Sequence, residues 1–168
     1  MMPLSACFAT TTKKMADLQY FYWDACPFCA VFNKEDGRVE KCRQVLKAAE
    51  SKELKIVTSA LTVAEVVRVK DMERIPRGKE TTLHDFFQHE FIVIVSVDWF
   101  IATRARQLIY DYPALKPMDA IHLATAIKAK VFEMHSYDGG LLGLSEKAGM
   151  PTLPIRQPSI PEPPLLSN

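Results

Sequence analysis

The chain has 168 residues, of which 48% are apolar and 24% are charged, and its formal net charge is +1. This length and composition are typical of one soluble domain with a proper core. Because the net charge is so small, the protein is not a polycation, and any nucleic-acid binding has to come from a local basic patch. The longest apolar run, residues 91–95, is too short to span a bilayer, and residues 1–15 lack the apolar core of a signal peptide. We therefore expect a cytoplasmic protein.

Segments typical of strands and of helices alternate along the chain. Residues 1–17 offer little to bury and are expected to form a disordered leader. Aromatic and β-branched runs predict strands, and apolar residues at helical spacing predict helices. The predicted strands are residues 19–23, 56–58, 91–95, 131–136 and 152–153. The predicted helices are residues 27–33, 39–53, 61–69, 81–89, 97–110, 117–130 and 141–148, and residues 70–79 are expected to be a loop.

This alternation predicts a three-layer α/β/α domain with a central parallel sheet, covering residues 18–154. The remaining residues, 155–168, are rich in proline and are expected to form an extended or disordered tail.

Four acidic residues stand at the edges of these apolar segments. Asp24 follows the first strand and Asp138 follows the strand at residues 131–136, while Glu65 and Asp119 lie near the starts of apolar helices. In an open parallel sheet, strand ends and the starts of the following helices share one edge, where ligands bind. Four carboxylates gathered there would repel one another without a cation, and oxygen-only clusters suit Mg²⁺ or Mn²⁺.

In order and in local sequence, these segments resemble a PIN domain. The resemblance rests on Asp24-Ala-Cys, on Ser59-Ala-Leu-Thr-Val-Ala-Glu65, on Asp119-Ala-Ile-His-Leu-Ala-Thr-Ala and on Ser136-Tyr-Asp138. PIN domains are metal-dependent nucleases, and many are the toxins of VapC-type toxin–antitoxin pairs. One departure is Cys26, where the family usually has Asn or Ser.

The resemblance implies an endoribonuclease of the VapC type that hydrolyses RNA phosphodiester bonds with Mg²⁺ or Mn²⁺. It implies that Asp24, Asp119 and Asp138 bind metal directly and that Glu65 assists. RNA is then the substrate, and an antitoxin protein and a homodimer are the partners to test for. A PIN fold kept as a non-catalytic binding module is an alternative.

Each acidic residue also has a purely structural interpretation. Glu65 fits a capping box with Thr62, and Asp119 in a first turn favours the helix dipole. Ser136 is either a hydroxyl that supports the metal ligands or an ordinary strand-end residue. His122, one turn after Asp119, is expected to be a hydrogen-bonded core histidine and not a catalytic base.

Basic residues gather in the chain just after Glu65. Arg68, Arg74 and Arg77 are candidates for contacts with the RNA backbone, although a solvated surface is the usual meaning of such a run.

A CxxC motif, Cys26-Pro-Phe-Cys29, supports a rival hypothesis. With Tyr22-Trp23 before it, the segment resembles the active site of a thiol–disulfide redox protein, which depends on a thiol of low pKa at a helix start. Replacing both cysteines by serine separates the hypotheses, because a nuclease survives the change.

Overall fold

The computed structural model describes residues 18–67 and 74–160. Its centre is a five-stranded sheet in which every neighbouring pair of strands is parallel, in the order β3-β2-β1-β4-β5. The strands are β1 (Gln19–Trp23), β2 (Leu54–Ser59), β3 (Ile92–Val95), β4 (Glu133–His135) and β5 (Ile155–Arg156). The predicted parallel α/β sheet is thus confirmed.

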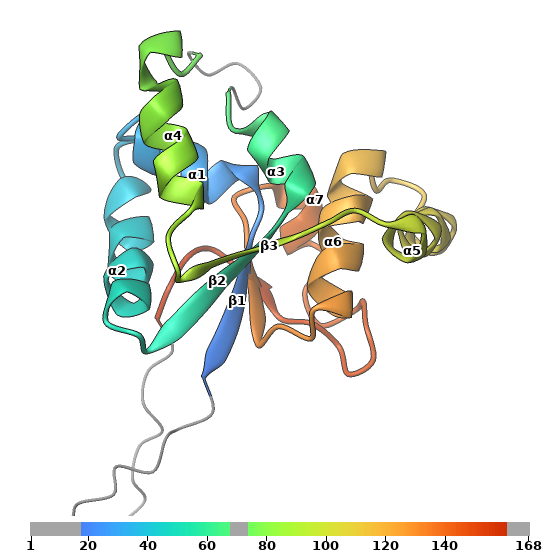
Figure 1. The fold of residues 1–168 in the computed structure, drawn as a ribbon. Helices are drawn as coiled ribbons and strands as arrows, with labels where there is room; N and C mark the ends of the chain where they lie inside the picture. The colour runs from blue at the N-terminus through green and yellow to red at the C-terminus, as the bar shows by residue number, and fades with distance from the viewer. Residues whose placement is uncertain (1–17, 68–73, 161–168) are drawn as a thin grey trace, which may run out of the picture.

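Helices cover both faces of the sheet, because side chains of β1 alternate between the faces. Phe21 and Trp23 pack into one core and Tyr22 into the other. On the first face lie α1 (Ala25–Phe32), α2 (Val39–Glu50) and α4 (Glu80–Phe87) (Figure 1). On the second lie α5 (Trp99–Asp111) and α6 (Pro117–Lys128) (Figure 1).

The chain reverses its direction across the sheet beside the central strand. From β1 it moves outward through β2 to β3, and then it returns to β4 on the other side of β1. The point between β1 and β4 is therefore the topological switch point, where open parallel sheets bind ligands. Two short helices begin at the carboxyl ends of strands: α3 (Ala60–Glu65) follows β2, and α7 (Gly139–Leu142) follows β4.

The last third of the chain differs from the prediction in two places. The helix predicted over residues 141–148 is wrong beyond Leu142: only α7 forms, and Glu146 has a φ of 59°, which a right-handed helix does not allow. The strand predicted at residues 152–153 is also wrong. The sheet instead ends in β5, where Ile155 lies beside Met134 of β4, within the residues that the sequence assigned to the tail.

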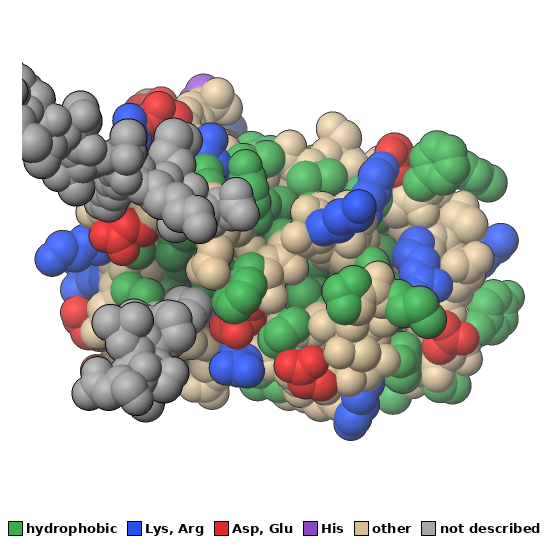
Figure 2. Space-filling model, turned by 90° about the horizontal axis from the view of Figure 1, so that it is seen from below, with side chains coloured by type: hydrophobic (Ala, Val, Ile, Leu, Met, Phe, Trp, Pro, Cys, Tyr) green, Lys and Arg blue, Asp and Glu red, His purple; other side chains and the backbone are tan. Residues whose placement is uncertain are grey.

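Apart from these two differences, the bounds of the helices and strands agree with the prediction to within a few residues. A 3₁₀ turn, η1 (Arg77–Lys79), follows the part of the loop that lies outside the described residues. Within the described residues, no helix combines the length and the apolar character that crossing a membrane requires. Seen from the end where the strands begin, basic and acidic side chains are interspersed (Figure 2).

Candidate active site at the carboxyl edge of the sheet

Asp24 is placed by the junction between β1 and α1. It directly follows β1 and is the N-cap of α1, and its Oδ1 accepts a hydrogen bond of 2.9 Å from the Cys26 amide. Its Oδ2 accepts from the Ser136 hydroxyl. Asp24 is only 3% exposed, so both oxygens are held inside the edge of the sheet.

Ser136 ties Asp24 to Asp138 across the switch point. It is fully buried at the end of β4, and its hydroxyl oxygen also accepts from the Asp138 amide at 2.9 Å. Asp138 is the N-cap of α7 and accepts from the amides of Gly140 and Leu141 at 2.8 and 3.2 Å. Ser136 therefore lies where the hypothesis of a supporting hydroxyl requires it.

Glu65 is not part of a capping box. The N-cap of α3 is Ser59, whose hydroxyl accepts from the Leu61 amide at 3.1 Å. Thr62, the expected cap, is buried and instead accepts from the Thr58 hydroxyl. Glu65 ends the helix, and its carboxylate is then free to reach across to α6, where it lies 2.6 Å from Nε2 of His122.

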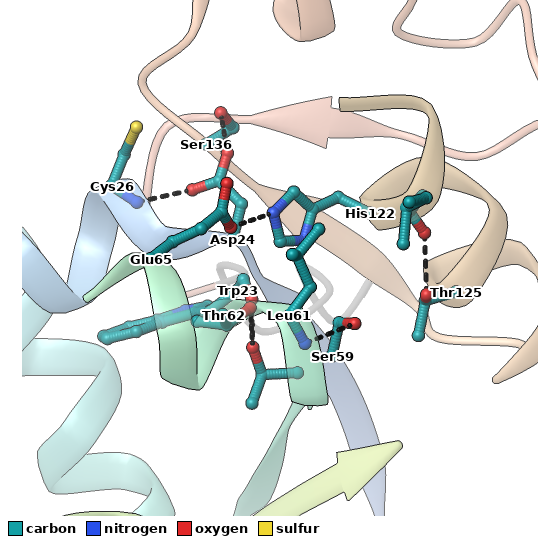
Figure 3. A network of polar contacts seen from close by, with 12 residues as sticks. Trp23, Asp24, Cys26, Ser59, Leu61, Thr62, Glu65, His122, Thr125 and Ser136 are labelled. Carbon is teal, nitrogen blue, oxygen red and sulfur yellow. Dashed lines mark hydrogen bonds and ion pairs between the residues drawn. The ribbon is translucent and has the colours of Figure 1, made fainter. Parts of the chain in front are cut away.

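His122 is the buried, hydrogen-bonded histidine that the sequence predicted. It is 2% exposed, and its Nδ1 lies 2.8 Å from the Tyr22 hydroxyl of β1. The sequence did not predict its contact with Glu65, because the two residues lie 57 positions apart. Figure 3 shows Asp24, Ser136, Glu65 and His122 close together.

The four predicted carboxylates line one cleft of about 1120 Å³. Asp119 enters it from the first turn of α6, half-buried. Two cations also line it, Arg74 and Lys116. The sequence did not predict a role for Lys116, although its position just before the first residue of α6 places it beside Asp119. A second hollow of about 530 Å³ shares Lys116, Asp119 and Asp138 with the cleft.

Burial makes two of the cleft carboxyls, those of Asp24 and Asp119, hold protons more tightly than free carboxyls do. Burial raises the pKa of Asp24 to about 6, and the Glu65 charge adds to the rise, while His122, Ser136 and the Cys26 amide oppose it. The pKa of Asp119 is also raised, first by burial and then by the Asp138 charge.

A sequence model of the PIN domain matches residues 21–144, well over half of the chain. The chain belongs to the PIN-domain family. No protein of curated function matches the chain in sequence.

Solved structures share the fold of this PIN domain. VapC20 of Mycobacterium tuberculosis, described as a sarcin-ricin loop cleaving toxin, is 15% identical and aligns over 73% of this chain and 93% of its own, with a TM-score of 0.60. A toxin–antitoxin complex from Klebsiella pneumoniae is 23% identical over 83% and 98%, with a TM-score of 0.53. FitAcB from Neisseria gonorrhoeae is 16% identical over 82% and 97%, also at 0.53. At these identities the likeness establishes the fold.

The donor set of the PIN domain fits a hard divalent cation in chemistry, since four carboxylates line one cleft. Within residues 18–67 and 74–160, however, no group of three or more His, Cys, Asp or Glu side chains is arranged so that it could hold a metal ion. The carboxylates of Asp24, Glu65 and Asp138 all accept hydrogen bonds from protein donors.

The CxxC motif lacks the property that redox chemistry needs. Burial raises the pKa of the Cys29 thiol to about 12 and, together with the Asp24 charge, raises that of Cys26 as well. Both cysteines are unpaired thiols, and a reactive thiolate needs a lowered pKa. Cys26 lines the cleft beside Asp24 instead.

The basic segment contributes one described side chain to the cleft. Arg74 lines it, whereas Arg77 lies on η1 outside it, and Lys79 donates to the Phe32 carbonyl at 3.1 Å. Arg68 lies outside the described residues.

Proposed function

We propose that this PIN domain is an endoribonuclease dependent on Mg²⁺ or Mn²⁺ that acts as the toxin of a toxin–antitoxin pair. One observation carries the proposal: four carboxylates from four separate segments line a single cleft at the switch point of the sheet. Acid groups that only stabilised the fold would have no reason to converge there, where burial raises the pKa of Asp24.

The cleft residues divide the work of phosphodiester hydrolysis. Asp24, Asp119 and Asp138 would hold the ion, with Glu65 assisting through its carboxylate. A divalent ion bound there supplies charge stabilisation to the phosphate and activates a water molecule for attack. Ser136 donates to Asp24 and accepts from the Asp138 amide, and so fixes the spacing of the two strand ends.

Among the described residues of the cleft, Arg74 and Lys116 are the cations available to the substrate. Both line the cleft, and Lys116 also lines the adjoining hollow, so each can contact a phosphate on the path of the RNA. Arg77, which lies outside the cleft, and Arg68, which lies outside the described residues, remain predicted contacts.

The partners are proposed from the solved structures that share this fold. VapC20 is described as a toxin that cleaves the sarcin-ricin loop, and the Klebsiella structure is a complex of toxin with antitoxin. We therefore expect an antitoxin protein as a partner of this chain. A homodimer is a further assembly to test, and we expect the protein to act in the cytoplasm.

The test is a cleavage assay on structured RNA with the purified chain. Cleavage should stop in chelator and return with Mn²⁺ or Mg²⁺. The variant with Cys26→Ser and Cys29→Ser should keep the same metal dependence, because neither thiol is required. Cleavage that persists in chelator would contradict the metal proposal, and a chain that binds RNA but never cuts it would be a binding module.

A further inference from the structure

Glu65 is held by two linked hydrogen bonds to which neither the family match nor the fold gives a role. They run from the Tyr22 hydroxyl on β1 through the His122 ring on α6 to Glu65 on α3, over distances of 2.8 and 2.6 Å. The His122 side chain is 3% exposed, whereas that of Glu65 is 19% exposed and lines the cleft. Figure 3 shows the His122 ring directed at the Glu65 carboxylate.

The chemistry of the two ends sets the direction of both hydrogen bonds. The ionised Glu65 carboxylate can only accept, so Nε2 of His122 donates to it. A neutral imidazole that has its proton on Nε2 can only accept at Nδ1, and the Tyr22 hydroxyl is the donor that faces Nδ1 at 2.8 Å. The Tyr22 hydroxyl therefore selects the tautomer that has its proton on Nε2.

Little besides this contact directs the Glu65 side chain. Glu65 is the last residue of a helix of six residues, and its carboxylate has no other hydrogen bond or ion pair within the described part of the chain. A glutamate has three rotatable side-chain bonds, so without a partner its carboxylate would sample many positions.

We propose that His122 and Tyr22 are positioning residues that aim Glu65 at the metal-binding cleft. His122 holds one carboxylate oxygen, Oε2, so the other oxygen of this cleft-lining residue is left for a ligand. The inference rests on the proposed function and extends it: metal ligands are commonly oriented by such outer hydrogen bonds, whose loss costs about 10- to 100-fold in metal affinity or activity.

The same fold contains a matched control. His135 is fully buried in β4, its Nδ1 accepts from the Trp23 indole at 3.0 Å, and its Nε2 lies 3.0 Å from Glu133. This pair repeats the donor, histidine and glutamate arrangement, but neither of its residues lines the cleft. A purely structural role for His122 predicts that variants of the two histidines behave alike.

The experiment compares Tyr22→Phe, His122→Gln, His122→Leu and His135→Gln with the parent. Cleavage is measured over a Mn²⁺ titration at equal folded fraction, determined from circular dichroism. We expect Tyr22→Phe and His122→Leu to need about 10- to 100-fold more Mn²⁺ for half-maximal cleavage. His122→Gln, which keeps a donor, should recover part of that loss, and His135→Gln should keep the parent's Mn²⁺ dependence.

Two results would overturn the inference. One is a parent-like Mn²⁺ requirement in both Tyr22→Phe and His122→Leu, and the other is an equal shift in His135→Gln. The tautomer gives a reading that does not need activity: long-range ¹H–¹⁵N spectra of the imidazoles should show His122 protonated at Nε2 in the parent. An inactive parent would contradict the proposed function, whereas a His122 protonated at Nδ1 would contradict the positioning role.

Discussion

Two acidic side chains, Glu133 in β4 and Asp24 just after β1, are buried to nearly the same degree but differ in their charged contacts. Glu133 is 4% exposed, contacts His135 at 3.0 Å and forms an ion pair with Arg156 at 3.5 Å. Asp24 is 3% exposed and accepts only from a hydroxyl and an amide, with no ion pair among the described residues. Glu133 thus has ion-pair partners in direct contact, whereas Asp24 has only neutral donors in direct contact and so favours a proton or an external cation.

This difference distinguishes an acid that stabilises the fold from an acid that serves a site. A buried charge without a partner is costly, and the cost is tolerated where a ligand relieves it. Asp119 belongs with Asp24, since burial and the Asp138 charge raise its pKa. The experiments below test this contrast.

The largest expected effect is on cleavage. Asp119→Asn should lower metal-dependent RNA cleavage by at least about 100-fold, because it removes one negative charge and a hard oxygen ligand from the cleft. Glu90→Gln, at an exposed carboxylate outside the cleft, is the matched control and should cleave like the parent. Full activity of Asp119→Asn in the purified protein would remove the proposed site.

The next effect is on stability: at Glu133 we expect the substitution to lower stability and to leave cleavage unchanged. Glu133→Gln should lower the free energy of unfolding by about 2 kcal/mol, because it weakens the buried hydrogen bond to His135 and removes the ion pair with Arg156. Its folded fraction should still cleave RNA with the parent's metal dependence. Urea titration measures the loss, and a Glu133→Gln protein as stable as the parent would refute the contrast between the two acids.

A third effect is the response of stability to metal. In chelator at neutral pH, Asp119→Asn should melt no lower than the parent, since removing one charge relieves repulsion within the cleft. Mn²⁺ at about 100 times its dissociation constant should stabilise the parent by about 2.7 kcal/mol and the variant much less. A lower melting temperature of the variant in chelator, with no response of the parent to Mn²⁺, would favour the helix-dipole role of Asp119.

The fourth effect is on pH dependence. The pKa of Asp24 is raised from 3.8 to about 6, so the folded state binds this proton more tightly than the unfolded state does. The resulting stabilisation is fully present below pH 3.8 and is lost as the pH rises through 6. Lowering the pH from 7 to 5 in chelator should therefore stabilise the parent by about 1 kcal/mol relative to Asp24→Asn.

The metal reverses that preference for low pH, because protons and cations compete for the same carboxylate. Cleavage should consequently fall below about pH 6 and recover with added Mn²⁺. A pH profile of cleavage that Mn²⁺ leaves unmoved would contradict the competition.

The smallest effect concerns the basic side chains. Arg74→Gln should weaken RNA binding and reduce the slope of log affinity against log salt by roughly one unit, because Arg74 lines the cleft. Arg77→Gln lies on η1 outside the cleft and serves as the control, with a smaller change expected. Equal slopes for both variants and the parent would reduce the segment to a solvated surface.

Local pattern was enough to predict much of the fold. The aromatic run of β1 and the apolar periodicity of α6 are properties of contiguous residues, and both elements lie where the sequence predicted them. The alternation of strands and helices then predicted a parallel sheet, and a parallel sheet brings strand ends to one edge. The convergence of Asp24, Glu65, Asp119 and Asp138 on one cleft follows from that rule.

Contacts between distant segments were beyond the sequence by itself. Only the tertiary structure brings His122 to Glu65, makes Ser136 a donor to Asp24, adds Lys116 to the cleft and pairs β5 with β4. Each depends on how α6, α3 and the two strands at the switch point pack, since side-chain hydrogen bonds form over about 3 Å and depend on orientation. The sequence by itself thus determined which acids share an edge, and tertiary packing decided which side chains contact each of them.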